Sequence, residues 1–486
     1  MLDFCLSFKF NLNFSDMAND DIQKYNINND NTLAGRSNVI RPVKISADEA
    51  LIYHREPRPG KIEVVPTKAY KGRRNLSLAY SPGVAYASEA IAEHPDQVYS
   101  LTDKGNLVAI ITNGTAVLGL GNIGPEAGKP VMEGKALLFK VFADIDCFDI
   151  ELKANDIDSF VETVTALAPT FGGINLEDIK APECFEIEDR LRKALDIPVL
   201  HDDQHGTAII TSAGILNALE IQGKDIHDVR LVVNGAGAAA IACTRMLISL
   251  GINPNNIVMC DSKGVISTRR SNLPPAKAEF ATERPLATLA QAMVGADIFL
   301  GLSVADVVTP RMLRSMAPRP VIFALANPNP EIDYRLARET RPDCIMATGR
   351  SDLPNQINNV LGFPYIFRGA LDSRASDINE PMKLAAARAI AELAHSPVPA
   401  YVLRAMGVEY MEFGPDYIVP TPYDHRLLTR VAPAVARAAA QSGVARRPIR
   451  DYEAYADSLS TLFTRDIDQL TDLFRIHPAS RHTSAG

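Results

Sequence analysis

Two pairs of adjacent acids lie upstream of a glycine-rich turn, and they are the groups in this 486-residue chain best suited to chemistry. The pairs are Glu177-Asp178 and Asp202-Asp203, and the turn is Asn234–Gly237. Neighbouring carboxylates repel one another, so a folded site holds them most easily around water or a cation. Hard carboxylate oxygens suit Mg²⁺ or Mn²⁺. The acid pairs therefore predict a divalent metal site.

The second acid pair has a distinctive context, because it lies within the segment His201–Thr207. An apolar stretch precedes this segment, a run of small residues follows it, and no cysteine stands near to favour zinc. His201 and His205 flank the acids and could be ligands themselves. We interpret both histidines as hydrogen-bonding supports for the carboxylates.

The glycine turn has the pattern of a dinucleotide site. Gly235–Ala240 follows an apolar stretch and opens an alanine-rich helix that ends at Gly251. The glycines allow a tight turn and close approach of a pyrophosphate to the helix N-terminus. Asp261 ends the next expected strand, and Ser262 and Lys263 follow it. A hydroxyl and an ammonium suit a ribose 2′-phosphate, whereas an acid alone favours the bare 2′-hydroxyl, so the sequence favours NADP over NAD.

Two further features are weak signals when taken alone and become informative only together with the acid pairs. The run Gly114–Gly124 resembles a second glycine fingerprint, and Lys135 follows Gly134 in otherwise apolar surroundings. A lysine buried near a cation has a lowered pKa and can act as a base, although a surface amine is the alternative. Tyr80 lies in a Ser-Pro-Gly turn and, taken alone, is only a packed tyrosine.

The elements that must position these groups begin with short strands and helices. Leu107–Thr112 is β-rich, and Phe139–Phe142 is expected to be another strand. The spacing predicts a helix over Glu183–Leu195. Ile197–Leu200 then reads as a strand that delivers Asp202-Asp203 at its C-terminal end. This order can fold the two acid pairs into one pocket.

The second half alternates strands and helices after a small-residue helix, Thr207–Leu219. This alternation predicts an α/β fold, with a mixed α/β N-terminal domain and a doubly wound, Rossmann-like nucleotide domain. The expected strands are Val229–Val233, Ile257–Cys260, Ile298–Leu302, Val321–Ala326 and Cys344–Ala347. The expected divisions are a disordered N-terminal extension, 1–41, a substrate and metal domain, 42–207, a nucleotide domain, 208–440, and a helical segment with a tail, 441–486.

Composition excludes several classes of protein. The formal net charge is −8, and no long basic run favours nucleic acid. Six cysteines form no C-x-x-C pair, and no apolar run reaches the roughly 20 residues that span a bilayer. Without a signal peptide pattern, the chain is expected to be cytoplasmic. Met17 is an alternative start to Met1.

Taken together, the motifs resemble those of malic enzymes, in order and spacing, over about residues 59–451. The likeness is strongest to the bacterial NADP-dependent branch, whose long members carry a C-terminal phosphotransacetylase-like domain that is absent here. A natural short form and a truncated gene both fit this ending. The motifs are Tyr80–Val84, Gly119–Gly124, Glu133–Lys135, Glu177-Asp178, His201–Thr207, Gly235–Gly237, Asn327-Pro328 and Asn355–Val360.

The resemblance implies oxidative decarboxylation of (S)-malate to pyruvate and CO₂ with reduction of NADP. Lys135 matches the base that takes the C2 hydroxyl proton, with Asp202 orienting it, and Tyr80 matches the acid that protonates C3. Mg²⁺ or Mn²⁺ would be held by Glu177, Asp178 and Asp203. A homo-oligomer built on a dimer is also implied. The alternatives are a dominant oxaloacetate decarboxylase activity or a catalytically silent NADP-binding regulatory protein.

The same resemblance implies the binding residues. Asn327 and Asn359 match residues that contact substrate. Ala116 stands where larger malic enzymes carry a carboxylate-gripping arginine, so Asn359 or Arg368 is expected to replace it. The cofactor residues are expected to be Val117, Gly119, Gly121, Asn122, Gly124, Gly235, Ala236, Gly237, Ala238, Ala239, Asp261, Ser262 and Lys263.

Overall fold

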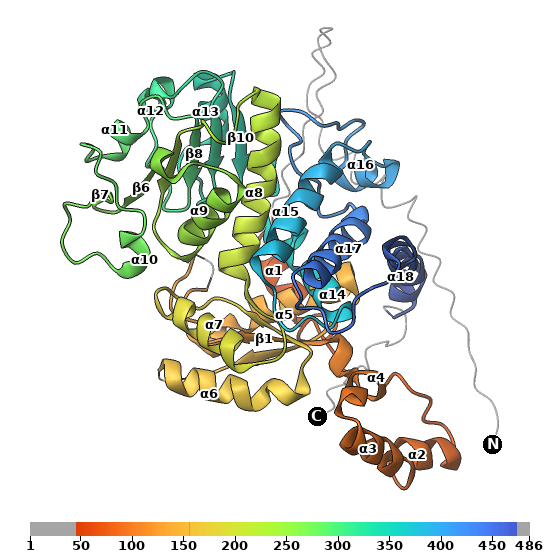
Figure 1. Cartoon of the computed structure of the whole chain (residues 1–486). Helices are drawn as coiled ribbons and strands as arrows, with labels where there is room; N and C mark the ends of the chain where they lie inside the picture. The colour runs from red at the N-terminus through yellow and green to blue at the C-terminus, as the bar shows by residue number, and fades with distance from the viewer. Residues whose placement is uncertain (1–44, 118, 155, 474–486) are drawn as a thin grey trace, which may run out of the picture. The chain divides into compact units, whose positions relative to one another are not determined.

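A computed structural model describes residues 45–117, 119–154 and 156–473, with side chains given as far as residue 462 (Figure 1). The described residues fall within one compact unit. The predicted extension over 1–41 and the end of the chain after residue 473 lie outside the described residues. No helix that the structure describes is long and apolar enough to cross a membrane.

The first sheet brings the two acid pairs to one edge. Its four strands are parallel, in the order β2-β1-β3-β4. Because β3 and β4 are parallel neighbours, the residues that follow them emerge side by side at the carboxyl edge. Glu177 follows β3, and Asp202 follows β4. The strands are β1 (Leu107–Thr112), β2 (Asp146–Glu151), β3 (Gly173–Leu176) and β4 (Val199–His201).

Three helices accompany this sheet, α5 (Pro125–Ala143), α6 (Ile157–Leu167) and α7 (Glu183–Ala194). The strand predicted over Phe139–Phe142 is wrong, because these residues lie in α5. A helical stripe explains the correction, since the buried positions of α5 follow the three-and-four spacing of a helix face. That stripe is Met132, Ala136, Phe139 and Ala143.

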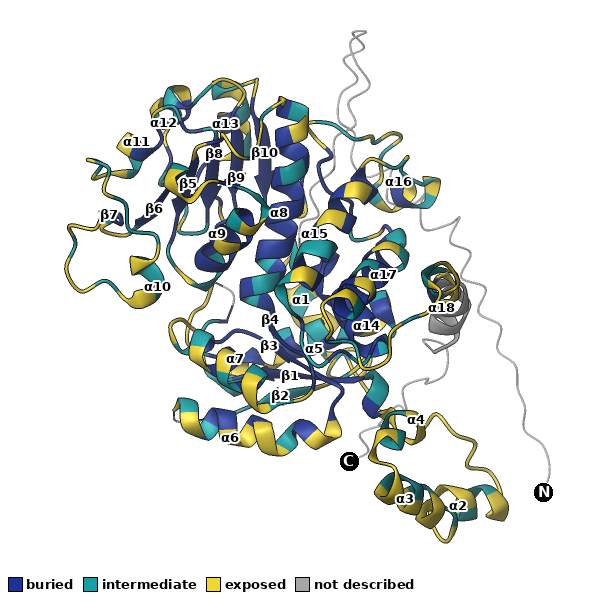
Figure 2. Cartoon of the chain, in the orientation of Figure 1, coloured by how far each residue is buried: buried dark blue, intermediate teal, exposed yellow. Residues whose placement is uncertain are grey.

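Helix α8 (Asp202–Gln222) connects β4 of the first sheet to β5 (Leu231–Asn234) of the second sheet. It begins at Asp202, five residues before the predicted start, so the second acid pair forms its first turn. Buried residues lie on all sides of α8, as Figure 2 shows, which is typical of a helix inside a core. It packs against α9 (Ala238–Leu250) and α15 (Glu380–Ala394).

The second sheet has the predicted doubly wound pattern, with strand order β10-β9-β8-β5-β6-β7. All neighbours are parallel except β6 and β7. The order reverses at β5, so the loop after β5 lies at a topological switch point, where open sheets bind ligands. The strands are β5 (Leu231–Asn234), β6 (Ile257–Asp261), β7 (Gly264–Val265), β8 (Ile298–Gly301), β9 (Val321–Ala324) and β10 (Ile345–Thr348), joined by helices α10 (Pro275–Ala278), α11 (Leu289–Ala292), α12 (Pro310–Ser315) and α13 (Tyr334–Thr340). The α/β fold class is confirmed.

The remaining helices differ in burial. The first four contain no buried residue, whereas α14 and α17 bury most of theirs. The first four are α1 (Ala47–Arg55), α2 (Arg73–Ala79), α3 (Gly83–Glu93) and α4 (Val98–Leu101). The later ones are α14 (Phe363–Asp372), α16 (Ala400–Met406), α17 (Arg426–Gln441) and α18 (Tyr452–Leu473). Short 3₁₀ turns lie at Pro95–Gln97, Asp103–Asn106, Ala168–Thr170, Pro254–Asn256 and Asn359–Leu361.

Candidate active site

Three carboxylates converge at the carboxyl edge of the first sheet. Glu177, Asp178 and Asp203 each offer an oxygen atom, and these oxygens all lie within 4.8 Å of one another. Asn175 Nδ2 donates to Glu177 Oε2 over 2.8 Å, and the backbone N–H of Asp178 donates to Asp203 Oδ2 over 2.8 Å. Hydrogen-bonded carboxylate oxygens at this separation are the donor set that Mg²⁺ and Mn²⁺ prefer. The residues present therefore fit a divalent cation.

The loop after β3 holds Asp178 in an unusual backbone conformation. Its φ of 55° lies in the left-handed region, which aspartate tolerates better than most residues. The carbonyl of Asp178 accepts the N–H of Ala116 over 2.9 Å, and the N–H of Lys180 donates to Thr115 Oγ1 over 3.0 Å. These bonds fix the acid pair against the start of the glycine run.

Lys135 points from α5 at the same carboxylates. Its Nζ lies 2.6 Å from Asp202 Oδ2, 3.0 Å from Glu177 Oε1 and 4.2 Å from the centre of the Phe363 ring. Burial lowers the pKa of Lys135, but Asp202 and Glu177 outweigh it and raise the pKa above the ordinary value. These contacts alone therefore favour the charged amine, and the lowered lysine pKa expected beside a cation stays a prediction.

Burial raises the pKa of Glu177 well above its ordinary value, and Asp203 and Asp202 add to this rise while Lys135 opposes it. The positive charge of Lys135 thus does not neutralise the negative charges of the surrounding carboxylates. A divalent cation would supply the missing positive charge.

Asp202 contacts different residues from its neighbour Asp203. Asp202 is fully buried, and its Oδ2 accepts from Asn359 Nδ2 over 3.1 Å as well as from Lys135. Asn359 Oδ1 in turn accepts the hydroxyl of Thr207 over 3.1 Å. A β-carbon on Gly206 would come within 2.0 Å of Asp202 Oδ1, so only glycine fits beside this carboxylate. Asp202 therefore faces the lysine and the amide.

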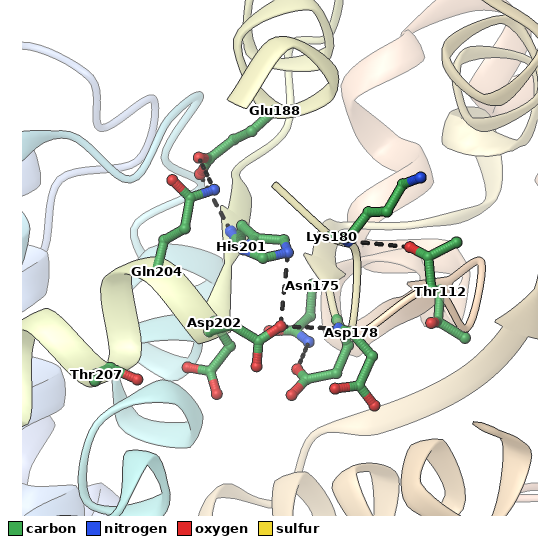
Figure 3. Close-up of polar contacts among 12 residues, drawn as sticks. Thr112, Asn175, Asp178, Lys180, Glu188, His201, Asp202, Gln204 and Thr207 are labelled. Carbon is green, nitrogen blue, oxygen red and sulfur yellow. Dashed lines mark hydrogen bonds and ion pairs between the residues drawn. The ribbon is translucent and has the colours of Figure 1, made fainter. Parts of the chain in front are cut away.

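The flanking histidines contact Glu188, an acid that the sequence analysis missed. Glu188 Oε1 lies 2.9 Å from His205 Nε2 and accepts the backbone N–H of His201 over 3.1 Å. Burial would raise the pKa of Glu188, but His205 outweighs it and lowers this pKa to about 2. Figure 3 shows His201 between Glu188 and the carboxylates. The available signal was an acid on the apolar stripe of α7, beside Cys184, Ile187 and Leu191.

The glycine turn of the second sheet leaves room for a ligand. Gly235 has a φ of +124°, and a β-carbon there would lie 2.3 Å from the carbonyl oxygen of Leu302. Gly237 has no atom within 4 Å of its β-carbon position. The helix α9 begins directly after it, at Ala238, without a side-chain cap on its first N–H groups. Open space beside free N–H groups at a helix N-terminus suits a pyrophosphate.

Asp261 at the end of β6 is already paired. Arg270 Nη1 and Nη2 bind its two oxygens over 2.9 and 2.8 Å, and Lys277 Nζ lies 3.3 Å away. The hydrogen bonds from Arg270 are the largest cause that lowers the pKa of Asp261 to about 2. Ser262 and Lys263 are exposed beside it. No motif in the sequence marks Arg270 or Lys277, so neither residue was predicted.

The glycine run of the first sheet approaches the loop after β9. A β-carbon on Gly119 would lie 3.5 Å from the carbonyl oxygen of Asn327 and 3.7 Å from Pro328 Cδ. Val117 is buried, and its N–H donates to the carbonyl of Gly121 over 2.9 Å. The described part of the run is therefore a tight loop beside Asn327, whose side chain is exposed.

Two predicted site residues lie elsewhere. Arg368 is buried, its Nε bonded to Asp372 and its Nη1 to Asn106, so it does not replace the missing arginine at Ala116. Tyr80 directly follows α2, and 78% of its surface is exposed. Helix α2 packs against α3, and Figure 1 shows both helices away from α5 and α8. The structure does not bring Tyr80 to Lys135.

The comparisons with known proteins agree across both sheets. The family described as "Malic enzyme, N-terminal domain" matches residues 59–192, and "Malic enzyme, NAD binding domain" matches residues 204–402. An NADP-dependent malic enzyme of Halomonas elongata is 58% identical over 82% of this chain and 94% of its own length. A crystal structure of malic enzyme from Pyrococcus horikoshii superposes with a TM-score of 0.81 at 41% identity, covering 88% of this chain and 98% of that one.

Some relatives are much longer. The NADP-dependent malic enzyme of Escherichia coli K12 is 59% identical over 413 residues, which are 85% of this chain but 54% of the relative. The chain thus spans about half the length of several curated relatives that it matches. An NAD-dependent malic enzyme of Rhizobium meliloti is 56% identical to this chain. Relatives named for NAD and relatives named for NADP are thus similarly close in sequence.

Proposed function

The chain belongs to the malic enzyme family, and from this premise we propose that it oxidises and decarboxylates (S)-malate to pyruvate and CO₂ while reducing NADP. One observation carries the proposal: three converging carboxylates lie beside a buried lysine on the first sheet. A tight glycine turn at the switch point of the second sheet supplies the place for the nucleotide.

A divalent cation held by Glu177, Asp178 and Asp203 would polarise the C2 oxygen of malate. Lys135 would take the C2 hydroxyl proton, and the nicotinamide of a bound cofactor would serve as the hydride acceptor. Asp202 holds Nζ of Lys135 through its 2.6 Å contact and so aims the base. Asp202 and Glu177 raise the pKa of Lys135, and Glu177 is itself one of the proposed cation ligands. A bound cation would oppose this rise and favour the neutral amine, which is the form that can accept a proton.

Loss of the C4 carboxylate as CO₂ leaves an enolate that needs a proton at C3. Tyr80 is the proposed acid for this step. Its hydroxyl must therefore come within hydrogen-bond reach of both the substrate and Lys135. Asn359, which is already bonded to Asp202, and Asn327, beside the glycine run, are the proposed substrate contacts.

The contacts of Asp261 support NADP as the cofactor. Arg270 neutralises a carboxylate that would otherwise repel a 2′-phosphate. Lys263 and Lys277 add positive charge beside it. The cofactor residues named from the sequence, the domain divisions near residues 207 and 440, a cytoplasmic location and a dimer-based homo-oligomer are part of this proposal.

The test is a spectrophotometric assay of nicotinamide reduction. We expect absorbance of reduced cofactor to rise when malate, Mg²⁺ and NADP are all present, and to rise more slowly with NAD. Omission of the metal or prior treatment with a chelator should stop the reaction. Pyruvate and CO₂ should form in step with reduced cofactor. A protein that decarboxylates oxaloacetate but never reduces NADP with malate would overturn the proposal.

A further inference from the structure

A fully buried carboxylate joins two loops of the second sheet. Glu331 has no exposed surface, and it lies after β9, in the segment that follows Asn327-Pro328. Its Oε1 accepts the backbone N–H of Ser303 over 2.9 Å and the Ser303 hydroxyl over 3.2 Å. Its Oε2 accepts the backbone N–H of Ala326 over 3.1 Å. One side chain therefore fixes both the loop after β8 and the loop after β9.

The carboxylate of Glu331 lies against the end of β8. A β-carbon on Gly301, the last residue of β8, would come within 2.4 Å of Cδ of Glu331, so only glycine fits there. Ser303 Oγ in turn accepts Asn234 Nδ2 over 2.7 Å, and Asn234 ends β5. The ends of β5, β8 and β9, which lie side by side in the sheet (Figure 2), are thus joined by one set of hydrogen bonds that includes Glu331.

Hydrogen-bond donors rather than a cation surround this carboxylate. Both oxygens of Glu331 accept hydrogen bonds, as those of an ionised carboxylate do. Burial raises the pKa of Glu331, and the N–H groups of Ala326 and Ser303 are the largest causes that oppose this rise. Among the described residues, no lysine, arginine or histidine forms an ion pair with Glu331. A buried charge without a counter-ion acts over a longer range than a charge in water, because the protein interior has a low dielectric constant.

The strand order places Glu331 in one half of the nucleotide site. A dinucleotide binds across the sheet at the switch point, with its pyrophosphate at the turn after the strand where the order reverses. Here that strand is β5, and Asp261 at the end of β6 marks the side of the adenosine ribose. The nicotinamide half then lies on the other side of β5, towards β8 and β9. The loops that Glu331 fixes therefore border the nicotinamide half.

The two forms of the cofactor differ in charge in this half. The nicotinamide ring is positively charged in NADP⁺ and neutral in NADPH, so a negative charge nearby stabilises the oxidised ring relative to the reduced ring. We propose that the buried carboxylate of Glu331 biases this site toward NADP⁺ and against NADPH. This inference rests on the nucleotide site of the proposed function. The bias favours uptake of the oxidised cofactor and release of the reduced one, as malate oxidation requires.

Binding of both cofactor forms to Glu331→Gln, which lacks the charge, tests this bias. Isothermal titration calorimetry measures the Kd of NADP⁺, and fluorescence of the reduced ring measures the Kd of NADPH, both without malate or metal. We expect the ratio of the NADP⁺ Kd to the NADPH Kd to rise on the order of 10-fold, which is the effect of a unit charge about 10 Å away at an effective dielectric constant of about 20. An unchanged ratio in a variant that binds both forms would overturn the inference.

Two matched variants separate the charge of Glu331 from its position. Glu331→Asp keeps the charge but shortens the side chain, and Ser303→Ala keeps the charge but removes one hydrogen bond. A loosened loop weakens the binding of NADP⁺ and NADPH alike, so the ratio of the two Kd values should stay close to that of the wild type in both variants. A rise in Glu331→Asp as large as that in Glu331→Gln would show that position rather than charge sets the preference, and would contradict the proposal.

Glu331→Ala is a second neutral variant, needed because the amide of Glu331→Gln would face the N–H of Ala326. In Glu331→Ala, water can fill the space and accept from the donors that the carboxylate leaves. The Tm of each variant reports whether it folds, and the same rise of the ratio is expected in Glu331→Ala. A wild-type ratio in this variant would overturn the inference. A wild-type protein that binds neither cofactor form would instead contradict the proposed function, and this inference with it.

Discussion

The four acids Glu177, Asp178, Asp202 and Asp203 lie close together but contact different partners. Asp203 joins Glu177 and Asp178, whereas its neighbour Asp202 points at Lys135. The first turn of α8 causes this division, because adjacent residues of a helix point about 100° apart. Two acids that are inseparable in the sequence thus contact different partners.

Asp203→Asn should remove a cation ligand while leaving the fold intact, since the amide is isosteric and Asp203 is only partly buried. We expect Mn²⁺ binding to weaken by on the order of 100-fold and malate oxidation to fall with it. Isothermal titration with Mn²⁺ measures the affinity directly. Glu186→Gln, an exposed acid on α7, is the control and should bind Mn²⁺ normally. Unchanged affinity in Asp203→Asn would place the cation elsewhere.

The site residues that the sequence could predict are those in compact motifs. The acid pairs, the glycine turn and Lys135 stand in short segments whose chemistry is local. Arg270 and Glu188 were missed, because each acts through a partner that only folding brings near: Asp261 for the first and His205 for the second. Tyr80 was identified by resemblance, but its position depends on packing that a motif does not encode.

Most of the predicted site residues lie in the loops that directly follow β-strands. Every site segment named from the sequence in the second half follows a strand or begins a helix, and the five predicted strands there are present within two residues at each end. The first half was harder to predict. Strands β2 and β3 were not predicted, because β2 carries Asp146, Asp149 and Glu151 and β3 interrupts its two apolar residues with Gly173 and Asn175. Strands with few apolar residues give little hydrophobic signal.

The turn between β5 and α9 predicts different outcomes for its two glycines. Gly235→Ala forces a side chain at positive φ against the carbonyl of Leu302, so the turn should distort and NADP binding should be lost. Gly237→Ala has free space in the protein, so its thermal stability should stay near wild type. Its added methyl group would still obstruct a pyrophosphate. Calorimetry and NADP titration of both variants separate these effects, and normal binding by Gly237→Ala would contradict the assigned site.

The ion pair of Asp261 with Arg270, at the end of β6, predicts that the stability of the protein depends on pH. Asp261 has a folded pKa lowered to about 2, chiefly by Arg270. Because this pKa lies below that of the unfolded chain, the stabilisation is fully present above about pH 4 and is lost as the pH falls toward the folded value. Asp261→Asn should therefore lower the urea midpoint at pH 7, and the gap to wild type should narrow below about pH 4.

Arg270→Gln removes the same ion pair from the other side and is the companion variant. It should lower the urea midpoint at pH 7 as well. A gap between Asp261→Asn and wild type that stays constant from pH 7 to pH 3.5 would show that the ion pair does not contribute to stability in this way.

Across the whole molecule, one buried core joins the two sheets. The largest hydrophobic cluster includes Val108 and Ile110 of β1, residues along α8, and Leu231 and Val233 of β5. Because the core is continuous, we expect both sheets to unfold in one transition. The proposed division near residue 207 falls within α8 and so does not separate two independent cores.

Phe139→Ala tests this continuity. Phe139 is fully buried, and its ring centre lies 4.7 Å from that of Phe363 and 5.3 Å from that of Phe367. Truncation should cost about 3–5 kcal/mol and lower the Tm of the single transition. Phe148→Ala, at a partly exposed ring, should cost clearly less. Two separate calorimetric transitions in the Phe139→Ala variant would contradict a shared core.

The exposure of α2 and α3 has a consequence for how the chain meets a protease. Neither helix buries a residue, so local opening of these helices costs less free energy than opening of the core. Limited proteolysis of the chain should therefore cut first between residues 73 and 93, and the part that contains both sheets should resist for longer.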